Sequence, residues 1–155
     1  GIVVAGVGMD GPPQRWRAYV LADATVQGTG PAGWARAAVA AVRDYGADRL
    51  VAEVNQGGKL VEAVLRQVDP LVPYRAVHAS RGKSARAEPV AALYEQGRVR
   101  HVGDLAGLED QMCLMTPEGF SGQGSPDRVD ALVWAMHELM IAPAARFSSP
   151  RIRTL

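Results

Sequence analysis

The sequence is poor in cysteine, in long apolar runs and in excess charge of either sign. Cys113 is the only cysteine, which excludes an internal disulfide framework and makes a structural zinc site improbable. No apolar run is long enough to span a bilayer, so we expect no membrane partner. Lys and Arg total 17 against 16 Asp and Glu, a formal charge of +1. Any contact with DNA must therefore come from a local patch.

The chain has the length and composition of one globular domain. Its 155 residues are 48% hydrophobic, enough for an ordinary buried core. We predict a folded domain over residues 1–143 and a flexible basic tail over 144–155, because the tail has arginines among Ser and Pro but no apolar period. The first residue is Gly1 and the chain begins directly with a strand pattern, so we interpret it as a fragment of a longer protein.

Apolar periodicity and turn residues together predict a mixed α/β sheet with flanking helices. The first two strands, 1–7 and 16–23, are separated by a Gly-Pro-Pro turn and should form an antiparallel hairpin. Strands and helices then alternate, which predicts parallel pairing. The predicted later strands are 49–54, 74–78 and 98–102; the predicted helices are 31–45, 57–68, 83–96, 105–115 and a last one from 125.

Some details of these elements are also predicted. Leu60 is expected to face inward with Val61, Val64 and Leu65, and the last helix is expected to begin with Ser125 as its N-cap and Pro126 at its first position. Residues 116–124 are expected to form a loop. The three tryptophans fall at apolar periodic positions and are expected in the core: Trp16, Trp34 and Trp134.

Glu53 ends an otherwise apolar strand, at the sheet edge where open α/β folds bind ligands. Asn55 and two glycines follow, and the glycines allow either close backbone approach by a ligand or a tight turn. Glu53 is therefore a candidate catalytic residue. The alternative is a glutamate that points into water or caps the next helix.

Asp127 and Asp130 lie three residues apart at the start of the last helix and share one face. Asp127 could merely complement the helix dipole. Asp130 precedes the apolar run 131–136, where a partly buried acid needs a partner, and a divalent cation is one such partner. With Glu53 these acids would supply the oxygen ligands that suit Mg²⁺ or Mn²⁺.

A basic segment lies at the junction before the helix 83–96. Arg81, Lys83 and Arg86 stand where exposed helix-start amides and cations could meet phosphate oxygens. The alternative is a plain solvated loop. No nucleophile elbow or complete phosphate-binding loop is present elsewhere in the sequence.

Several short stretches, each weak alone, agree in order and spacing with one family. They are 19–23 (YVLAD), 51–58 (VAEVNQGG), 82–89 (GKSARAEP), 97–101 (GRVRH), 108–112 (LEDQM) and 125–134 (SPDRVDALVW). With these stretches the chain resembles, over most of residues 1–140, the nuclease domain of large terminase subunits from tailed phages and related gene-transfer particles.

The resemblance implies a ribonuclease H-like sheet with three acids. Glu53 matches the second acid, Asp130 the third, and Asp127 an accessory ligand position one turn earlier. The first acid belongs to a strand that would precede Gly1, so we expect the first strand and its aspartate to be missing here. Asp10 and Asp23 do not match that position. Asp23 and Asn55 remain possible residues near the site.

The function so implied is a metal-dependent DNA endonuclease that cuts concatemeric DNA during genome packaging. Two Mg²⁺ or Mn²⁺ ions would activate water and stabilise the leaving oxygen, while Lys83 and Arg86 hold phosphates. The implied partners are double-stranded DNA, the terminase ATPase domain, the small terminase subunit and the portal, in the cytoplasm of a bacterial host cell. Without the first acid, we expect this chain to fold but to cleave DNA poorly.

Two alternatives of other kinds stay open. A nuclease resembling Holliday-junction resolvases or transposases would leave the same acids. A non-catalytic module that binds DNA or the portal would use them only to cap helices and to interact with solvent.

Overall fold

The computed structural model describes residues 1–54, 58–116 and 118–148. In chain order the elements are β1 (Val3–Gly8), η1 (Pro13–Arg15), β2 (Arg17–Asp23), α1 (Pro31–Asp44), β3 (Leu50–Glu53), α2 (Gly58–Val68), β4 (Tyr74–Val77), α3 (Lys83–Glu95), β5 (Val99–His101), α4 (Ala106–Cys113), β6 (Met115–Thr116), β7 (Gly119–Phe120), α5 (Asp127–Met136), η2 (His137–Ile141) and α6 (Ala142–Ser148). The predicted order of strands and helices is confirmed, with an additional short hairpin, β6–β7, where a loop was expected.

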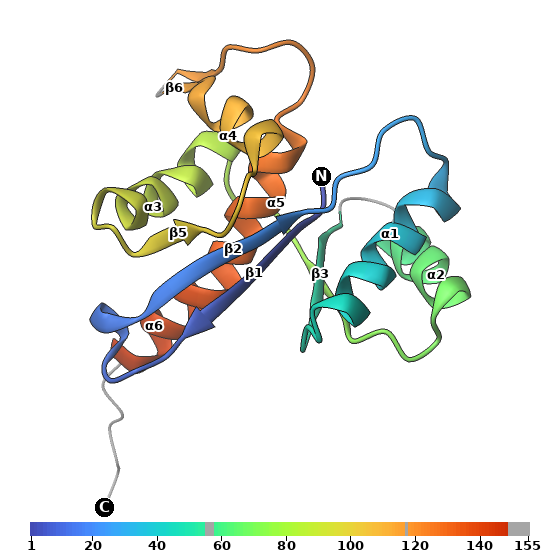
Figure 1. Cartoon of the computed structure of the whole chain (residues 1–155), viewed down its shortest axis with the longest axis horizontal. Coiled ribbons are helices and arrows are strands. Elements are labelled where there is room, and N and C mark those ends of the chain that lie inside the picture. Colours follow the sequence, from blue (N-terminus) through green and yellow to red (C-terminus); the bar gives the residue numbers. More distant parts are fainter. Residues whose placement is uncertain (55–57, 117, 149–155) are drawn as a thin grey trace, which may run out of the picture.

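The strands pair as a mixed α/β fold, but not in one continuous sheet. β1 and β2 form the predicted antiparallel hairpin, β2 pairs in parallel with β5, and β3 pairs in parallel with β4. Within the described residues, no ladder joins β1 to β3. The helix α5 contacts β1, β2 and β3 and therefore connects the two sheets (Figure 1).

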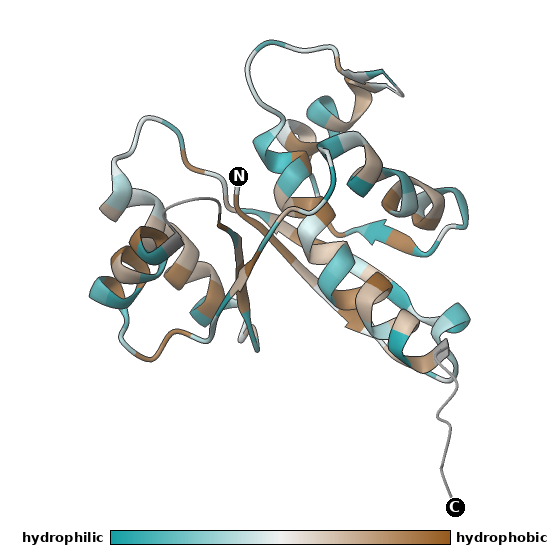
Figure 2. Cartoon of the chain, turned by 180° about the vertical axis from the view of Figure 1, so that it is seen from behind, coloured by the Kyte–Doolittle hydropathy of each residue, from teal (hydrophilic) through white to brown (hydrophobic). Residues whose placement is uncertain are grey.

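Two buried clusters correspond to these two sheets. The larger one lies between the β1–β2–β5 sheet and the helices α3, α4 and α5, with Leu108, Leu132 and Met136 fully buried. The smaller one lies under α1 and α2 around Leu65. Figure 2 shows β1 coloured hydrophobic along most of its length where it crosses α5. In the described part of the chain no helix is both long and apolar enough to cross a membrane.

Two details of the helices differ from the predictions. Leu60 is 68% exposed rather than inward, because Val61, Val64 and Leu65 centre the apolar stripe of α2 and leave Leu60 at its margin. Ser125 is not the N-cap of α5. That position is taken by Pro126, and the Ser125 hydroxyl instead accepts a hydrogen bond from the Lys83 ammonium, 3.0 Å away.

The end of the described chain is more ordered than the sequence suggested. Helical structure continues past Pro143 to Ser148, although we expected order to end at that proline. Pro143 lacks the N–H that a continuous α-helix needs, and the chain accommodates it with a π-helical segment, His137–Ile141, directly before α6. Phe147 of α6 then makes an edge-to-face contact with Trp16, with ring centroids 5.5 Å apart. The tail prediction for residues 149–155 lies outside the described residues.

The burial pattern predicts that the same substitution has different effects at two leucines. Leu132→Ala, at a side chain that is 1% exposed, should lower the free energy of unfolding by about 2–5 kcal/mol, because it leaves a cavity beneath α5. Leu60→Ala should change it by no more than about 0.5 kcal/mol. Urea unfolding measures both values, and equal losses would contradict the described core.

Candidate functional site

The predicted acids converge where three elements meet. Glu53 is the last residue of β3, Arg86 lies in the first turn of α3, and Asp130 and Trp134 lie one turn apart on α5. The Arg86 guanidinium contacts both carboxylates, 2.9 Å from Glu53 and 3.7 Å from Asp130. The two acids that the sequence singled out are therefore neighbours, joined by one planar cation.

The Glu53 carboxylate is oriented by two donors on the same oxygen. Its Oε2 accepts hydrogen bonds from the Arg86 guanidinium at 2.9 Å and from the Trp134 indole Nε1 at 2.7 Å. Within the described residues, no hydrogen bond reaches the other oxygen, Oε1. Among the described residues, the carboxylate is thus held through one oxygen only.

Asp130 is paired with two cations. Its Oδ2 forms an ion pair with the Lys83 ammonium, and its Oδ1 lies near Arg86. Lys83 also donates to Ser125 at the turn before α5. Since the Lys83 side chain is about half exposed, this pair borders on solvent, whereas the Arg86 pairs are largely enclosed.

Arg86 is the buried member of the cluster. It is 6% exposed, and it is the only charged residue among the buried ones in the described chain. Its guanidinium lies over the Trp134 ring, 4.8 Å from the centroid. Its backbone carbonyl accepts a hydrogen bond from His137 Nε2 at 2.9 Å. A buried cation needs compensating charge, and Glu53 and Asp130 supply it.

The pKa of Glu53 reflects these contacts. Partial burial alone raises the pKa of this carboxyl. The hydrogen bonds from Trp134 and Arg86 and the positive charges of Arg86 and Lys83 outweigh burial and bring the pKa below its ordinary value. The carboxylate therefore stays ionised at neutral pH.

The other predicted site residues are placed differently. Asp127 is exposed at the first residue of α5, and its carboxylate has no ion-pair partner within the described residues. Arg81 is exposed on the loop before α3. Asn55 lies outside the described residues. The structure therefore brings together Glu53, Asp130, Lys83 and Arg86.

Asp23 is held by contacts to the end of its own strand and to α5. Its Oδ2 accepts a hydrogen bond from Arg128 Nε at 2.6 Å, and its Oδ1 accepts one from the Thr25 backbone N–H at 3.0 Å. Partial burial raises the pKa of this carboxyl, but the bonds from Thr25 and Arg128 outweigh it and bring the pKa below its ordinary value. Asp23 thereby joins the end of β2 to the start of α5.

The cluster does not form a metal site as it stands. Among residues 1–54, 58–116 and 118–148, no three His, Cys, Asp or Glu side chains are close enough together to hold a metal ion. Glu53 and Asp130 have the oxygen chemistry that Mg²⁺ and Mn²⁺ prefer. Both are instead neutralised by the chain's own cations.

Trp134 and His137 were not predicted to lie at the site, although they contact Glu53 and Arg86. Trp134 was assigned to the core, but it is only half-buried and its N–H holds Glu53. The available signal was helical spacing, because Trp134 and His137 follow Asp130 by four and seven residues and so lie on the same face of the helix.

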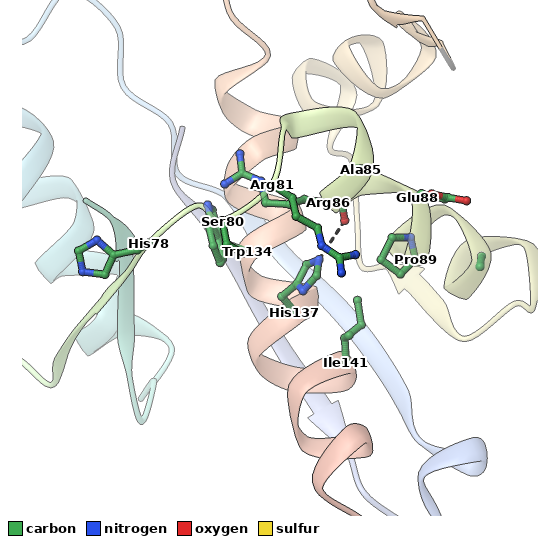
Figure 3. Close-up of a pocket in the computed structure, with 11 residues that line it drawn as sticks. His78, Ser80, Arg81, Ala85, Arg86, Glu88, Pro89, Trp134, His137 and Ile141 are labelled. Carbon is green, nitrogen blue, oxygen red and sulfur yellow. Dashed lines mark hydrogen bonds between the residues drawn. The ribbon is translucent and has the colours of Figure 1, made fainter. Parts of the chain in front are cut away.

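Next to the acids lies a hollow of about 760 Å³. It is bounded by the loop before α3, by α3 itself and by the α5–η2 helix (Figure 3). Trp134 and Arg86 line it and also contact Glu53, so the hollow and the acid cluster share a wall.

The family model described as the terminase RNaseH-like domain matches residues 1–139 of this chain. The chain therefore belongs to the terminase ribonuclease H-like domain family, a class of nuclease domains. This confirms both the resemblance and the ribonuclease H-like fold that it implied. No curated protein and no solved structure matches the chain significantly.

The contacts of Glu53 predict a pH-dependent contribution to stability. Because folding lowers the pKa of this carboxyl, its contribution is complete above the unfolded value of 4.5 and is lost as the pH falls through the lower folded value. Glu53→Gln should lower the free energy of unfolding by about 1–3 kcal/mol near neutral pH.

The difference in unfolding free energy between Glu53→Gln and the unsubstituted protein should shrink as the pH falls below 4.5, the pKa of Glu53 in the unfolded chain. Urea unfolding at about pH 7 and about pH 3 measures it. Glu95→Gln, at an exposed glutamate of α3, is the matched control and should have little effect at either pH. A Glu53→Gln effect that does not depend on pH would contradict a stabilising contribution of the Glu53–Arg86 ion pair.

Proposed function

We propose that the chain is the DNA endonuclease domain of a large terminase, which hydrolyses phosphodiesters at the Glu53–Asp130 pair. The observation that supports this most is the contact of both carboxylates with one buried guanidinium. The contacts hold two acids, one at the end of a strand and one on a helix, close together, as a site for hard cations requires. The family membership supports the nuclease role in general.

Divalent metal, Mg²⁺ or Mn²⁺, is part of this proposal. Bound near the acids, two such ions would activate water and stabilise the leaving oxygen. Glu53 would bind through Oε1, to which no described residue donates, and Asp130 would become available once Lys83 leaves it. Asp127, one turn earlier on α5, and the first-strand acid that the resemblance implies would complete the ligands.

The cations have a second role in the proposal. Lys83 is half exposed at the start of α3, so on leaving Asp130 it would meet a DNA phosphate. Arg81 is exposed on the preceding loop and would also meet phosphate there. Arg86 was predicted to bind DNA as well. Because Arg86 is buried and donates to Glu53, we assign it the role of positioning the Glu53 carboxylate instead.

The biological setting is proposed from the family. The domain would cut double-stranded concatemeric DNA during genome packaging in the cytoplasm of a bacterial host cell. It would act with the terminase ATPase domain, the small terminase subunit and the portal. The ion-paired state of the acids also suits a non-catalytic DNA- or portal-binding module, and a cleavage assay separates the two functions.

Plasmid nicking tests the endonuclease directly. In a version of the protein extended upstream of Gly1, we expect nicking with Mg²⁺ or Mn²⁺ that Asp130→Asn reduces on the order of a hundredfold or more, because the substitution removes a metal ligand. Asp44→Asn, at an exposed acid of α1, should leave nicking unchanged.

The chain that begins at Gly1 should nick poorly if, as the resemblance implies, neither Asp10 nor Asp23 serves as the first-strand acid. Equal metal-dependent nicking by both versions would place Asp10 or Asp23 in that role. Nicking that survives Asp130→Asn would contradict the proposed site and favour the binding module.

Replacing Lys83 should change the affinities for Mn²⁺ and for duplex DNA in opposite directions. Lys83→Met should strengthen Mn²⁺ binding several-fold, because it removes the cation that competes for Asp130. It should weaken binding of duplex DNA and lower the slope of log affinity against log salt by about one unit. The measurements are Mn²⁺ titration followed by electron paramagnetic resonance, and DNA binding in EDTA.

Lys59→Met is the matched control, at an exposed lysine on α2. It should alter neither affinity. Weaker Mn²⁺ binding by Lys83→Met would show that Lys83 supports the metal site rather than competing for it.

A further inference from the structure

We propose that the hollow between α3 and the α5–η2 helix binds one unpaired nucleotide of the DNA strand, next to the phosphodiester held at the acids. This inference rests on the proposed endonuclease function and specifies its substrate as DNA that is locally unstacked. The hollow, of about 760 Å³, falls in the size range of sites for small organic ligands.

One wall of the hollow is apolar and suits the flat face of a base. Pro89 and Ala92 of α3, Ile141 of η2 and Trp134 of α5 all line it. Trp134 also contacts Glu53 and so marks the side toward the acids. Figure 3 shows Ile141 and His137 projecting from one helix toward the α3 side of the hollow, where Pro89 lies. A base in such a slot would gain contact with hydrocarbon and aromatic surface without needing a particular sequence.

One backbone carbonyl of α3 beside the hollow lacks its usual helical hydrogen bond. Pro89 lies inside the helix and has no N–H, so the carbonyl of Ala85 lacks its usual α-helical donor. Ala85 lines the hollow. The N–H groups on the edge of a base are donors of the kind that such a carbonyl accepts. The next carbonyl, that of Arg86, is already occupied by His137.

The rim of the hollow is suited to a phosphate. Arg81 and His78 are exposed there, and within the described chain neither side chain has a hydrogen-bond or ion-pair partner. Lys83 and Arg86, in contrast, are already paired with acids. An anion arriving at this rim would therefore meet unpaired donors on the loop before it competed with the internal ion pairs.

The position of the hollow favours a nucleotide over an unrelated small molecule. Its shared wall, Trp134 and Arg86, contacts Glu53 at 2.7 and 2.9 Å. A strand whose phosphodiester lies at the acids would place its neighbouring nucleotide here. A base stacked in a duplex does not present its face to such a slot, so the nucleotide must be unpaired or extruded.

The test compares DNA strands with and without bases. Fluorescence anisotropy in EDTA would measure binding of a single-stranded oligonucleotide and of an abasic oligomer with the same number of phosphates. We expect the base-bearing strand to bind more tightly by about tenfold, the contribution of one accommodated base. Because EDTA prevents metal-dependent cleavage, this outcome does not depend on nuclease activity.

Two substitutions locate the effect. Ala85→Phe fills the hollow from an exposed helix position and should abolish the preference for bases, whereas Ala40→Phe, at an exposed alanine of α1, should preserve it. Arg81→Gln should weaken binding of both oligomers alike and reduce the salt slope by about 0.7, the value for one phosphate contact on a single strand. Arg36→Gln, on α1, is its charge-matched control.

Equal affinities for the base-bearing and abasic strands would overturn the inference, as would a preference that survives Ala85→Phe. Preference for bases without any nicking by the upstream-extended protein would retain the nucleotide site and reject the endonuclease. Nicking that depends on Asp130, without a preference for bases, would retain the endonuclease and reject the nucleotide site.

Discussion

The burial of the Arg86 guanidinium between two carboxylates is the constraint on which the site depends. A cation removed from water must be matched by nearby negative charge, and the chain supplies it from β3 and from α5. This requirement holds Glu53 and Asp130 together although they belong to different elements. The same guanidinium lies over Trp134, which in turn fixes Glu53. Acid, base and aromatic side chains thus form one connected unit.

This unit also joins the two halves of the fold. β3 and β4 form a sheet of their own, and α5 is the helix that both sheets contact. Glu138 of η2 forms ion pairs with Arg49 at 3.3 Å and with Arg75 at 3.1 Å. These pairs hold the β3–β4 sheet against the α5–η2 helix. Glu53 adds the contact at the carboxyl end of β3. The geometry of the site and the docking of the small sheet therefore depend on each other.

Much of this arrangement was predictable from local patterns. Alternation of strands and helices gave the mixed fold, and a strand-end glutamate with an aspartate entering an apolar helix identified the acids. The interior position of Arg86 was not predictable, because arginine is rarely buried unless it is paired and the pairs come from distant segments. Ser125 shows the same limit: its local pattern indicated an N-cap, but a tertiary hydrogen bond from Lys83 engages its hydroxyl. The separation of the sheet in two likewise depends on non-local strand pairing.

The central claim is that Glu53 and Asp130 form one cation site whose present occupants are the chain's own Lys83 and Arg86. Anomalous X-ray diffraction from crystals of the upstream-extended protein soaked in Mn²⁺ tests it most directly. The account predicts an anomalous peak within direct ligand distance, about 2.0–2.6 Å, of oxygens from both acids, with the Lys83 ammonium displaced from Asp130. A peak elsewhere, with the Lys83–Asp130 and Arg86–Glu53 pairs intact, would contradict it.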